Sequence, residues 1–173
     1  YTFRCCMNLK DVVIPEGVTS IGGTAFAGCT KLTNVVLPAS LVNIEQWAFA
    51  GCRSLSSITI PEGVTRIEGA AFSNCSELTD IVIPDSVTSI GNSAFAGCGK
   101  LKSVVLPTGV TDIGEHMFWG CTDLADESGL VIIHGTLYSC VDDRDSVTIP
   151  KDVTRIGDGA FAGCGDLTDI TIP

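Results

Sequence analysis

Apolar and polar residues alternate in steps of two over short stretches of the chain, and each of these stretches ends at a proline. Ile58-Thr59-Ile60, just before Pro61, is one example. A period of two is typical of a β-strand, and the proline ends the strand because it has no backbone N–H to donate. The pattern therefore predicts one strand before each proline.

A second β-branched stretch follows most of the prolines, with apolar residues three positions apart, as in residues 64–67 (VTRI) and 87–90 (VTSI). We expect it to form a short extended segment on another side of the unit. The next segment, Ala-Phe-x-x-Cys, is too short for a stable helix. A single helical or 3₁₀ turn is expected there.

These elements recur with a period of 23 residues, interrupted once by a step of 43. All seven phenylalanines follow this spacing, and so do all seven prolines, at positions 15, 38, 61, 84, 107, 150 and 173. A single unit of this kind cannot bury its apolar face alone, so successive units stack. We predict a right-handed, β-rich solenoid of about seven coils that spans residues 1–173 as a single domain.

Most of the cysteines also follow the repeat and are expected to form one inward column. A small, soft thiol packs well beside the backbone of a turn. Parallel Cβ vectors at strand spacing of about 4.8 Å are too far apart for the Cβ separation of a disulfide, about 3.8 Å. We therefore expect reduced, buried thiols at Cys6, Cys29, Cys52, Cys75, Cys98, Cys121 and Cys164.

The unit L-x-x-[IV]-x-[IL]-P-x-x-[VL]-x-x-I-x-x-x-[AM]-F-x-x-C resembles the BspA-like, or treponemal-type, leucine-rich repeat. The resemblance covers nearly the whole chain. It implies a leucine-rich-repeat solenoid from a family of largely bacterial cell-surface or secreted proteins, some of them also found in anaerobic protists. Several members are regarded as adhesins, and the resemblance brings no catalytic residues with it.

One unit, between Cys121 and Pro150, is longer than the others by 20 residues. Residues 130–133 and 136–139 are expected to be two strands joined by a turn at His134-Gly135, because glycine tolerates the positive φ that a two-residue hairpin turn requires. We expect this hairpin insertion, at about residues 122–146, to be an irregular part of the coil. The alternative is a protrusion that binds a partner.

The same segment is acidic, and Arg144 is the one basic residue among its carboxylates. It lacks the glycine and the terminal glutamate of an EF-hand loop, so we expect a solvated loop rather than a calcium site. Its acidic residues are Asp123, Asp126, Glu127, Asp142, Asp143 and Asp145.

The net charge of −10 and the absence of a basic cluster argue against nucleic acid as a partner. The apolar runs are far shorter than the roughly 20 residues that span a bilayer, so we expect no direct membrane insertion. The first residues show no signal peptide, and any such signal or anchor is expected to lie outside this sequence. We expect the chain to be a fragment of a longer extracellular or cell-surface protein.

One row of side chains is the candidate partner-binding face. In each strand before a proline, the residue between the two inward apolar residues points outward. Outward β-branched residues suit any strand, but such a row also offers a platform for a protein or glycan ligand. This outward row consists of Val13, Val36, Thr59, Val82, Val105, Thr148 and Thr171.

Two tryptophans, Trp47 and Trp119, stand at positions that vary between repeats. Large exposed aromatic residues are common binding anchors, so both are candidate exposed aromatics. The alternative is local packing, with the tryptophans lying over the irregular hairpin.

The remaining chemistry predicts no enzyme. Zinc needs four converging ligands, whereas a column spreads its thiols along a line, so no metal or cofactor is assigned. Cys5 takes a slot that is mostly glycine and is expected to be exposed. Cys140 with His134 or His116 suggests a nucleophile and a base, but no orienting group accompanies them.

The sequence thus favours a non-enzymatic protein-binding or adhesion module. The second hypothesis is a structural spacer or stalk in a surface protein, because the units are so uniform.

Overall fold

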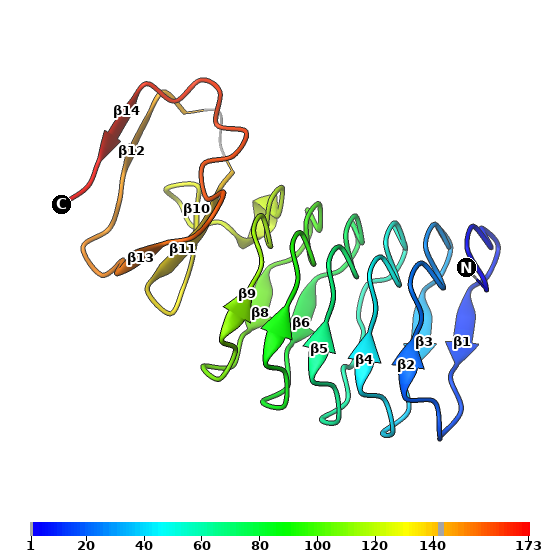
Figure 1. Ribbon diagram of the computed structural model, residues 1–173. Coiled ribbons are helices and arrows are strands. Elements are labelled where there is room, and N and C mark those ends of the chain that lie inside the picture. Colours follow the sequence, from blue (N-terminus) through cyan, green and yellow to red (C-terminus); the bar gives the residue numbers. More distant parts are fainter. Residues whose placement is uncertain (1, 142–143) are drawn as a thin grey trace.

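The chain winds into stacked coils, and the regular coils contribute two short strands each, except the third, which contributes one (Figure 1). The computed structural model describes residues 2–141 and 144–173. The first strand of each coil precedes the proline, and these strands are β1 (Asp11–Val13), β3 (Asn34–Val36), β6 (Asp80–Val82), β8 (Ser103–Val105), β12 (Ser146–Thr148) and β14 (Asp169–Thr171). The second strands follow the proline and are β2 (Ser20–Ile21), β4 (Asn43–Ile44), β5 (Arg66–Ile67), β7 (Ser89–Ile90), β9 (Asp112–Ile113) and β13 (Arg155–Ile156).

The second strands form the longest sheet of the molecule, with the order β2-β4-β5-β7-β9. All of its pairs are parallel, and the register places Ile21 beside Ile44 and Ile67 beside Ile90. The expected extended segment after each proline is therefore confirmed. It is the element that joins the first five coils into one continuous ladder.

The first strands pair in a less continuous way. β1 pairs with β3, β6 pairs with β8, and β12 pairs with β14, all of them parallel. Residues 58–60, which the sequence pattern predicts to be a strand, form no strand ladder with either neighbour in the part of the chain that the structure describes. The strand face therefore has an interruption at the third coil.

The segment around each phenylalanine is a series of tight turns, so the predicted helical or 3₁₀ turn is wrong there. Alternate N–H groups bond within the coil and to the next coil: Ala25 donates to Gly22, whereas Phe26 donates to Ala48. Two residues of the segment have positive φ, as at Thr24 (58°) and Gly28 (74°). The positive φ of these two residues breaks a continuous helical conformation, and the hydrogen bonds to the next coil let the turns stack.

The core consists of columns of identical side chains. The rings of Phe26, Phe49, Phe72 and Phe95 stack with centroids 5.3–5.5 Å apart and planes within 6° of parallel. Leucine and isoleucine columns pack around them, and most of their members are fully buried in the first five coils. The repeat found in the sequence is thus the spacing at which one apolar core continues from coil to coil.

The cysteine column packs as expected in the middle of the stack. Cys29, Cys52, Cys75, Cys98 and Cys121 are reduced and fully buried. Each thiol donates a hydrogen bond to a phenylalanine carbonyl of the preceding coil, for example Cys52 Sγ to Phe26 O at 3.2 Å. Cys6 is exposed and Cys164 is half-buried, because fewer coils of the structure pack around them.

The long unit contains the predicted hairpin. β10 (Leu130–Ile133) and β11 (Thr136–Cys140) are antiparallel, and the turn residues His134 and Gly135 have φ of 50° and 71°. β11 also pairs in parallel with β13, with Leu137 beside Ile156. The hairpin strand therefore takes the place of a second strand, and the extra 20 residues form a shortened coil.

The hairpin also separates two apolar cores. Val131 and Tyr138 pack into the core of the first five coils, whereas Leu130, Leu137 and Cys140 pack into a smaller core with the last coils. In Figure 1 the strands beyond the hairpin, β12–β14, run at an angle to β1–β9. The hairpin therefore serves packing on both of its faces, in agreement with the structural interpretation of this segment.

The acidic segment is held by one local carboxylate on its N-terminal side. Asp126 Oδ1 accepts hydrogen bonds from Ser128 N at 2.8 Å, Ser128 Oγ at 2.6 Å and Leu130 N at 3.0 Å. A short 3₁₀ segment, η1 (Thr122–Leu124), precedes it. Asp142 and Asp143, which belong to the predicted acidic loop, lie outside the described residues.

Candidate binding surface

The first strands present two outward rows, one polar and one β-branched. Within each strand the central residue points inward, so the residues on both sides of it point to solvent. The polar row contains Asp11, Asn34, Ser57, Asp80, Ser103, Ser146 and Asp169, all of them exposed. The other is the outward row predicted from the sequence, and it runs beside the polar row along the same face.

Every member of the outward row is exposed. The exposed fractions of the valines are 71% for Val13, 47% for Val36, 60% for Val82 and 53% for Val105. Strand register aligns Val13 with Val36, Val82 with Val105, and Thr148 with Thr171. The row therefore consists of aligned pairs of β-branched side chains with polar side chains alongside, and its role as a binding face stays a prediction.

A groove opens in this face where the strand ladder is interrupted. It has a volume of about 460 Å³ and lies between residues 34–37 and 57–59, with Ala39 and Pro61 at its end. Val36 and Thr59 of the outward row both line it. The middle of the candidate surface is therefore hollowed, whereas hydrogen-bonded strands fill the positions on either side.

The two tryptophans lie in different surroundings. Trp47 has a positive φ of 57° and is 47% exposed. Trp119 is 51% exposed, and its indole Nε1 donates a hydrogen bond to Ala162 O at 3.2 Å. Trp119 therefore connects the fifth coil to the last complete coil. Both tryptophans are about half exposed, and their role as binding anchors stays a prediction.

The variable position that holds Trp47 has a backbone explanation that the sequence pattern did not reveal. Thr24, Trp47, Ala70, Ser93 and His116 all have φ between 54° and 58°. The equivalent residue of the last complete coil is Gly159, and its missing Cβ leaves room for the His116 imidazole. Periodic glycine would have revealed this left-handed position, but only one coil has glycine there.

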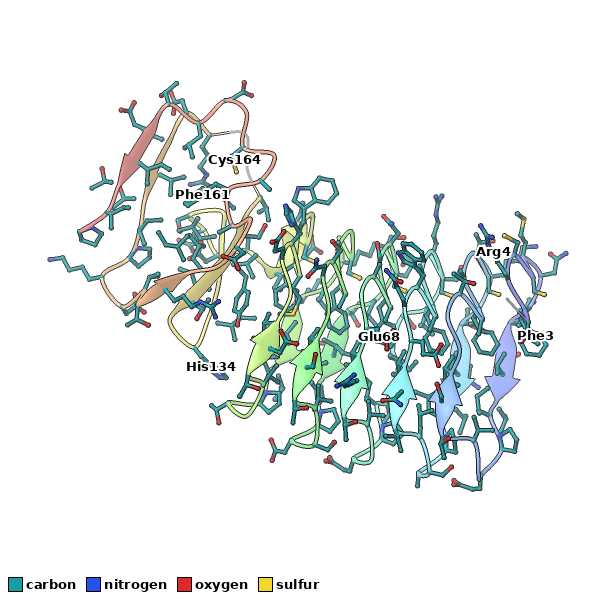
Figure 2. The ribbon with its side chains drawn as sticks, in the orientation of Figure 1. Phe3, Arg4, Glu68, His134, Phe161 and Cys164 are labelled. Atoms are coloured by element: carbon teal, nitrogen blue, oxygen red, sulfur yellow. The ribbon has the colours of Figure 1, made fainter. Side chains whose placement is uncertain are left out.

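The groups suspected of catalysis are not assembled. Cys140 is buried at one end of β11, whereas His134 is exposed at the hairpin tip, near the other end (Figure 2). His116 packs against Gly159 in the turn of another coil. The described residues contain no group of three or more His, Cys, Asp or Glu side chains arranged to hold a metal ion.

The buried thiols are unreactive near neutral pH. Burial raises the pKa of the Cys52 and Cys98 thiols to about 12, and it raises the pKa of Cys75 well above the ordinary value. Since the thiolate is the reactive form, these side chains are inert near neutral pH. They contribute packing and one weak hydrogen bond each.

In the described part of the chain, no helix is long and apolar enough to cross a membrane. The one helical element there is the three-residue segment η1.

A family model described as the BspA type leucine-rich repeat region matches six copies over residues 1–125 and 130–173. A leucine-rich repeat protein of T. pallidum, solved by crystallography, is 36% identical over 93% of this chain, with a TM-score of 0.68. One from Eubacterium ventriosum is 25% identical over 95% of this chain, with a TM-score of 0.72. One from Bacteroides ovatus, 23% identical over 98% of this chain with a TM-score of 0.55, shares the fold.

This chain spans 68%, 48% and 62% of the lengths of these three structures, respectively. No curated protein matches the sequence.

Proposed function

Because the chain belongs to the BspA-type leucine-rich repeat family, we propose that it is a non-enzymatic binding module of a bacterial cell-surface or secreted protein, and that its outward row contacts the ligand. The ligand is a protein or a glycan on a host or microbial surface. Adhesion is the biological role that this arrangement supports best.

The observation that carries the proposal is the row of exposed valines on an otherwise polar face. Fully burying a valine side chain stabilises a complex by about 1.5 kcal/mol or more. Val13, Val36, Val82 and Val105 are each about half exposed or more, so a partner that covers them gains several kcal/mol before the costs of association. The polar row beside them supplies hydrogen-bonding groups for orientation.

The extended shape of the molecule supports the same proposal. The stack offers an extended surface with a shallow groove rather than a deep pocket, which suits a large ligand better than a small metabolite. The groove between residues 34–37 and 57–59 interrupts the outward row near its middle. A side chain or a sugar of the ligand fits this groove, where Val36 and Thr59 are both reachable.

The proposed surface location rests on membership of the BspA-type leucine-rich repeat family. The net charge of −10 suits a partner that is not a polyanion.

Binding of the purified chain to immobilised matrix proteins, mucins and a glycan array tests the proposal. We expect saturable binding to at least one member of the panel at physiological salt. Failure to bind any protein, glycan or intact cell would contradict it and favour the alternative of a spacer, which the uniform coils and parallel register of the stack support.

A further inference from the structure

The last complete coil differs from the others in what its column cysteine contacts. In the regular coils the thiol donates to a phenylalanine carbonyl, as Cys121 Sγ does to Phe95 O at 3.2 Å. In the last complete coil Cys164 Sγ lies 3.6 Å from the carbonyl oxygen of Cys140. The residue whose carbonyl oxygen faces the Cys164 thiol is therefore itself a cysteine, Cys140.

Backbone pairing confirms that Cys140 stands where the regular coils have phenylalanine. Cys140 N donates to Ala160 O at 2.7 Å, just as Phe26 N donates to Ala48 O at 2.8 Å. Because the unit that contains Cys140 is shortened, this equivalence is hidden in the sequence.

The side chains of Cys140 and Cys164 belong to the same small core. Cys140 is one of its buried members, and Cys164 and Phe161 pack against it from the turn of the last complete coil (Figure 2). The two cysteines thus approach each other from different coils, one from the hairpin strand β11 and one from the turn.

A small cavity makes this pair reachable from solvent. It has a volume of about 170 Å³, both cysteines line it, and Trp119 lies at its side with Gly163. The thiols of Cys29 to Cys121 in the column have no exposed surface at all. A reagent therefore reaches the half-buried Cys164 without opening the main core, and the buried Cys140 lines the same cavity beside it.

We propose that Cys140 and Cys164 form a disulfide when the folded chain meets a low-molecular-weight disulfide, such as oxidised glutathione. The half-buried Cys164 loses its proton and attacks one sulfur of the reagent, which releases one reduced thiol and leaves a mixed disulfide. Cys140 then loses its proton and attacks the Cys164 sulfur, and the second reagent thiol leaves. Two protein thiols are oxidised and one reagent disulfide is reduced to two thiols.

The disulfide ties the hairpin to the last complete coil at the point where the regular stack is broken. The two cysteines are 24 residues apart, and the loop between them contains β12 and β13. Closing a loop of this size restricts the unfolded chain and raises the Tm. The bond forms in an oxidising exterior and stays open in a reducing compartment.

The test begins with the full chain carrying Cys5→Ser and Cys6→Ser, which removes the exposed thiols near the N-terminus. The folded protein is treated with oxidised glutathione, the remaining thiols are alkylated after denaturation, and the peptides are identified by mass spectrometry. We expect a peptide pair linked through Cys140 and Cys164, with the other column cysteines alkylated. A Trp47→Phe background leaves Trp119 as the fluorescent reporter, and its emission should change with oxidation and recover with a reductant.

Two variants control the assignment. Cys164→Ser should abolish both the linked peptide and the fluorescence change, whereas Cys98→Ser, in the buried column, should abolish neither. If either variant fails to fold, the peptide map of the parent protein still decides the question. Stable glutathione adducts on Cys140 and Cys164, a link to a different cysteine, or two unmodified thiols would each overturn the proposal.

Discussion

Phe118 meets Tyr138 edge-on, with ring centroids 5.7 Å apart and planes at 85°, whereas the phenylalanines before Phe118 stack nearly parallel. Phe118 ends the regular stack, and Tyr138 comes from the hairpin strand β11. This contact anchors β11 in the core of the first five coils, while Leu137 and Cys140 of the same strand pack into the smaller core. The Trp119–Ala162 hydrogen bond adds a second connection to the last complete coil. The coupling between the cores therefore depends on a few side chains rather than on a continuous strand ladder.

Replacing Tyr138 by alanine should weaken this coupling. Removing a buried aromatic ring costs about 3–5 kcal/mol, and here the loss falls on the contact that anchors the hairpin strand β11 in the core of the first five coils. We expect urea unfolding to separate into two transitions, the first from the coils beyond the hairpin. Tyr138→Phe keeps the ring and should retain one transition, and an unchanged Tyr138→Ala profile would contradict the coupling.

Gly51 tests the left-handed turn position. Its φ is 71°, so Gly51→Ala should destabilise the protein by about 1–2 kcal/mol even though the nearest atom to an added Cβ is 3.7 Å away. Gly99→Ala is the matched control, because Gly99 has no positive φ and only distant neighbours. Equal unfolding free energies for the two variants would show that backbone strain is not the cause.

The buried thiols predict loss of stability at alkaline pH. Burial raises the pKa of Cys52 and Cys98 from 9.0 to about 12, so the unfolded chain releases these protons at a lower pH than the folded chain does. Stability is therefore full below about pH 9 and falls as the pH rises toward 12, by about 1.4 kcal/mol per pH unit for each thiol.

The urea midpoint measured between pH 8 and 11 checks this dependence. Cys98→Ala should reduce the slope, whereas Cys5→Ser, at an exposed thiol, should leave it unchanged.

Asp126 is expected to make the free energy of unfolding depend on pH in the acid range, where stability falls as the pH falls. Burial raises its pKa, but the hydrogen bonds from Ser128 and Leu130 outweigh that effect and hold the pKa below the ordinary value of 3.8. Its stabilising contribution is present above that value and is lost as the pH falls below it. Asp126→Asn should abolish this part of the acid dependence, which thermal unfolding between pH 2 and 6 measures.

Much of the fold could be predicted because each repeated residue has one physical task. Proline ends a strand, phenylalanine stacks along the axis of the coils, and leucine packs in the core. Because these residues share one period, the sequence predicts a solenoid. Likewise, His134-Gly135 between two apolar runs gave the hairpin, because few other local structures use that turn.

Other features could not be predicted because their residues do not repeat. The left-handed position is occupied by different residue types, among them Thr24, Trp47 and His116, so the sequence gives no sign of its positive φ. The shortened coil moves Cys140 out of register with the phenylalanines whose place it takes. The gap at residues 57–59 has no sequence signal, because Ile58-Thr59-Ile60 has the same alternation as the paired strands.

The central claim is that the outward row is the binding face, and a comparison of two triple variants tests it most directly. Val36→Lys, Val82→Lys and Val105→Lys place three charges on the row. Thr19→Lys, Thr65→Lys and Thr111→Lys place the same three charges at exposed positions beside the second strands. Circular dichroism and Tm first establish that both proteins fold.

Affinity for the ligand found in the binding panel is then measured for both variants and the parent chain. The account predicts that the valine variant loses at least tenfold in affinity, about 1.4 kcal/mol, while the threonine variant binds like the parent. Equal binding by all three proteins, or a loss confined to the threonine variant, would contradict it.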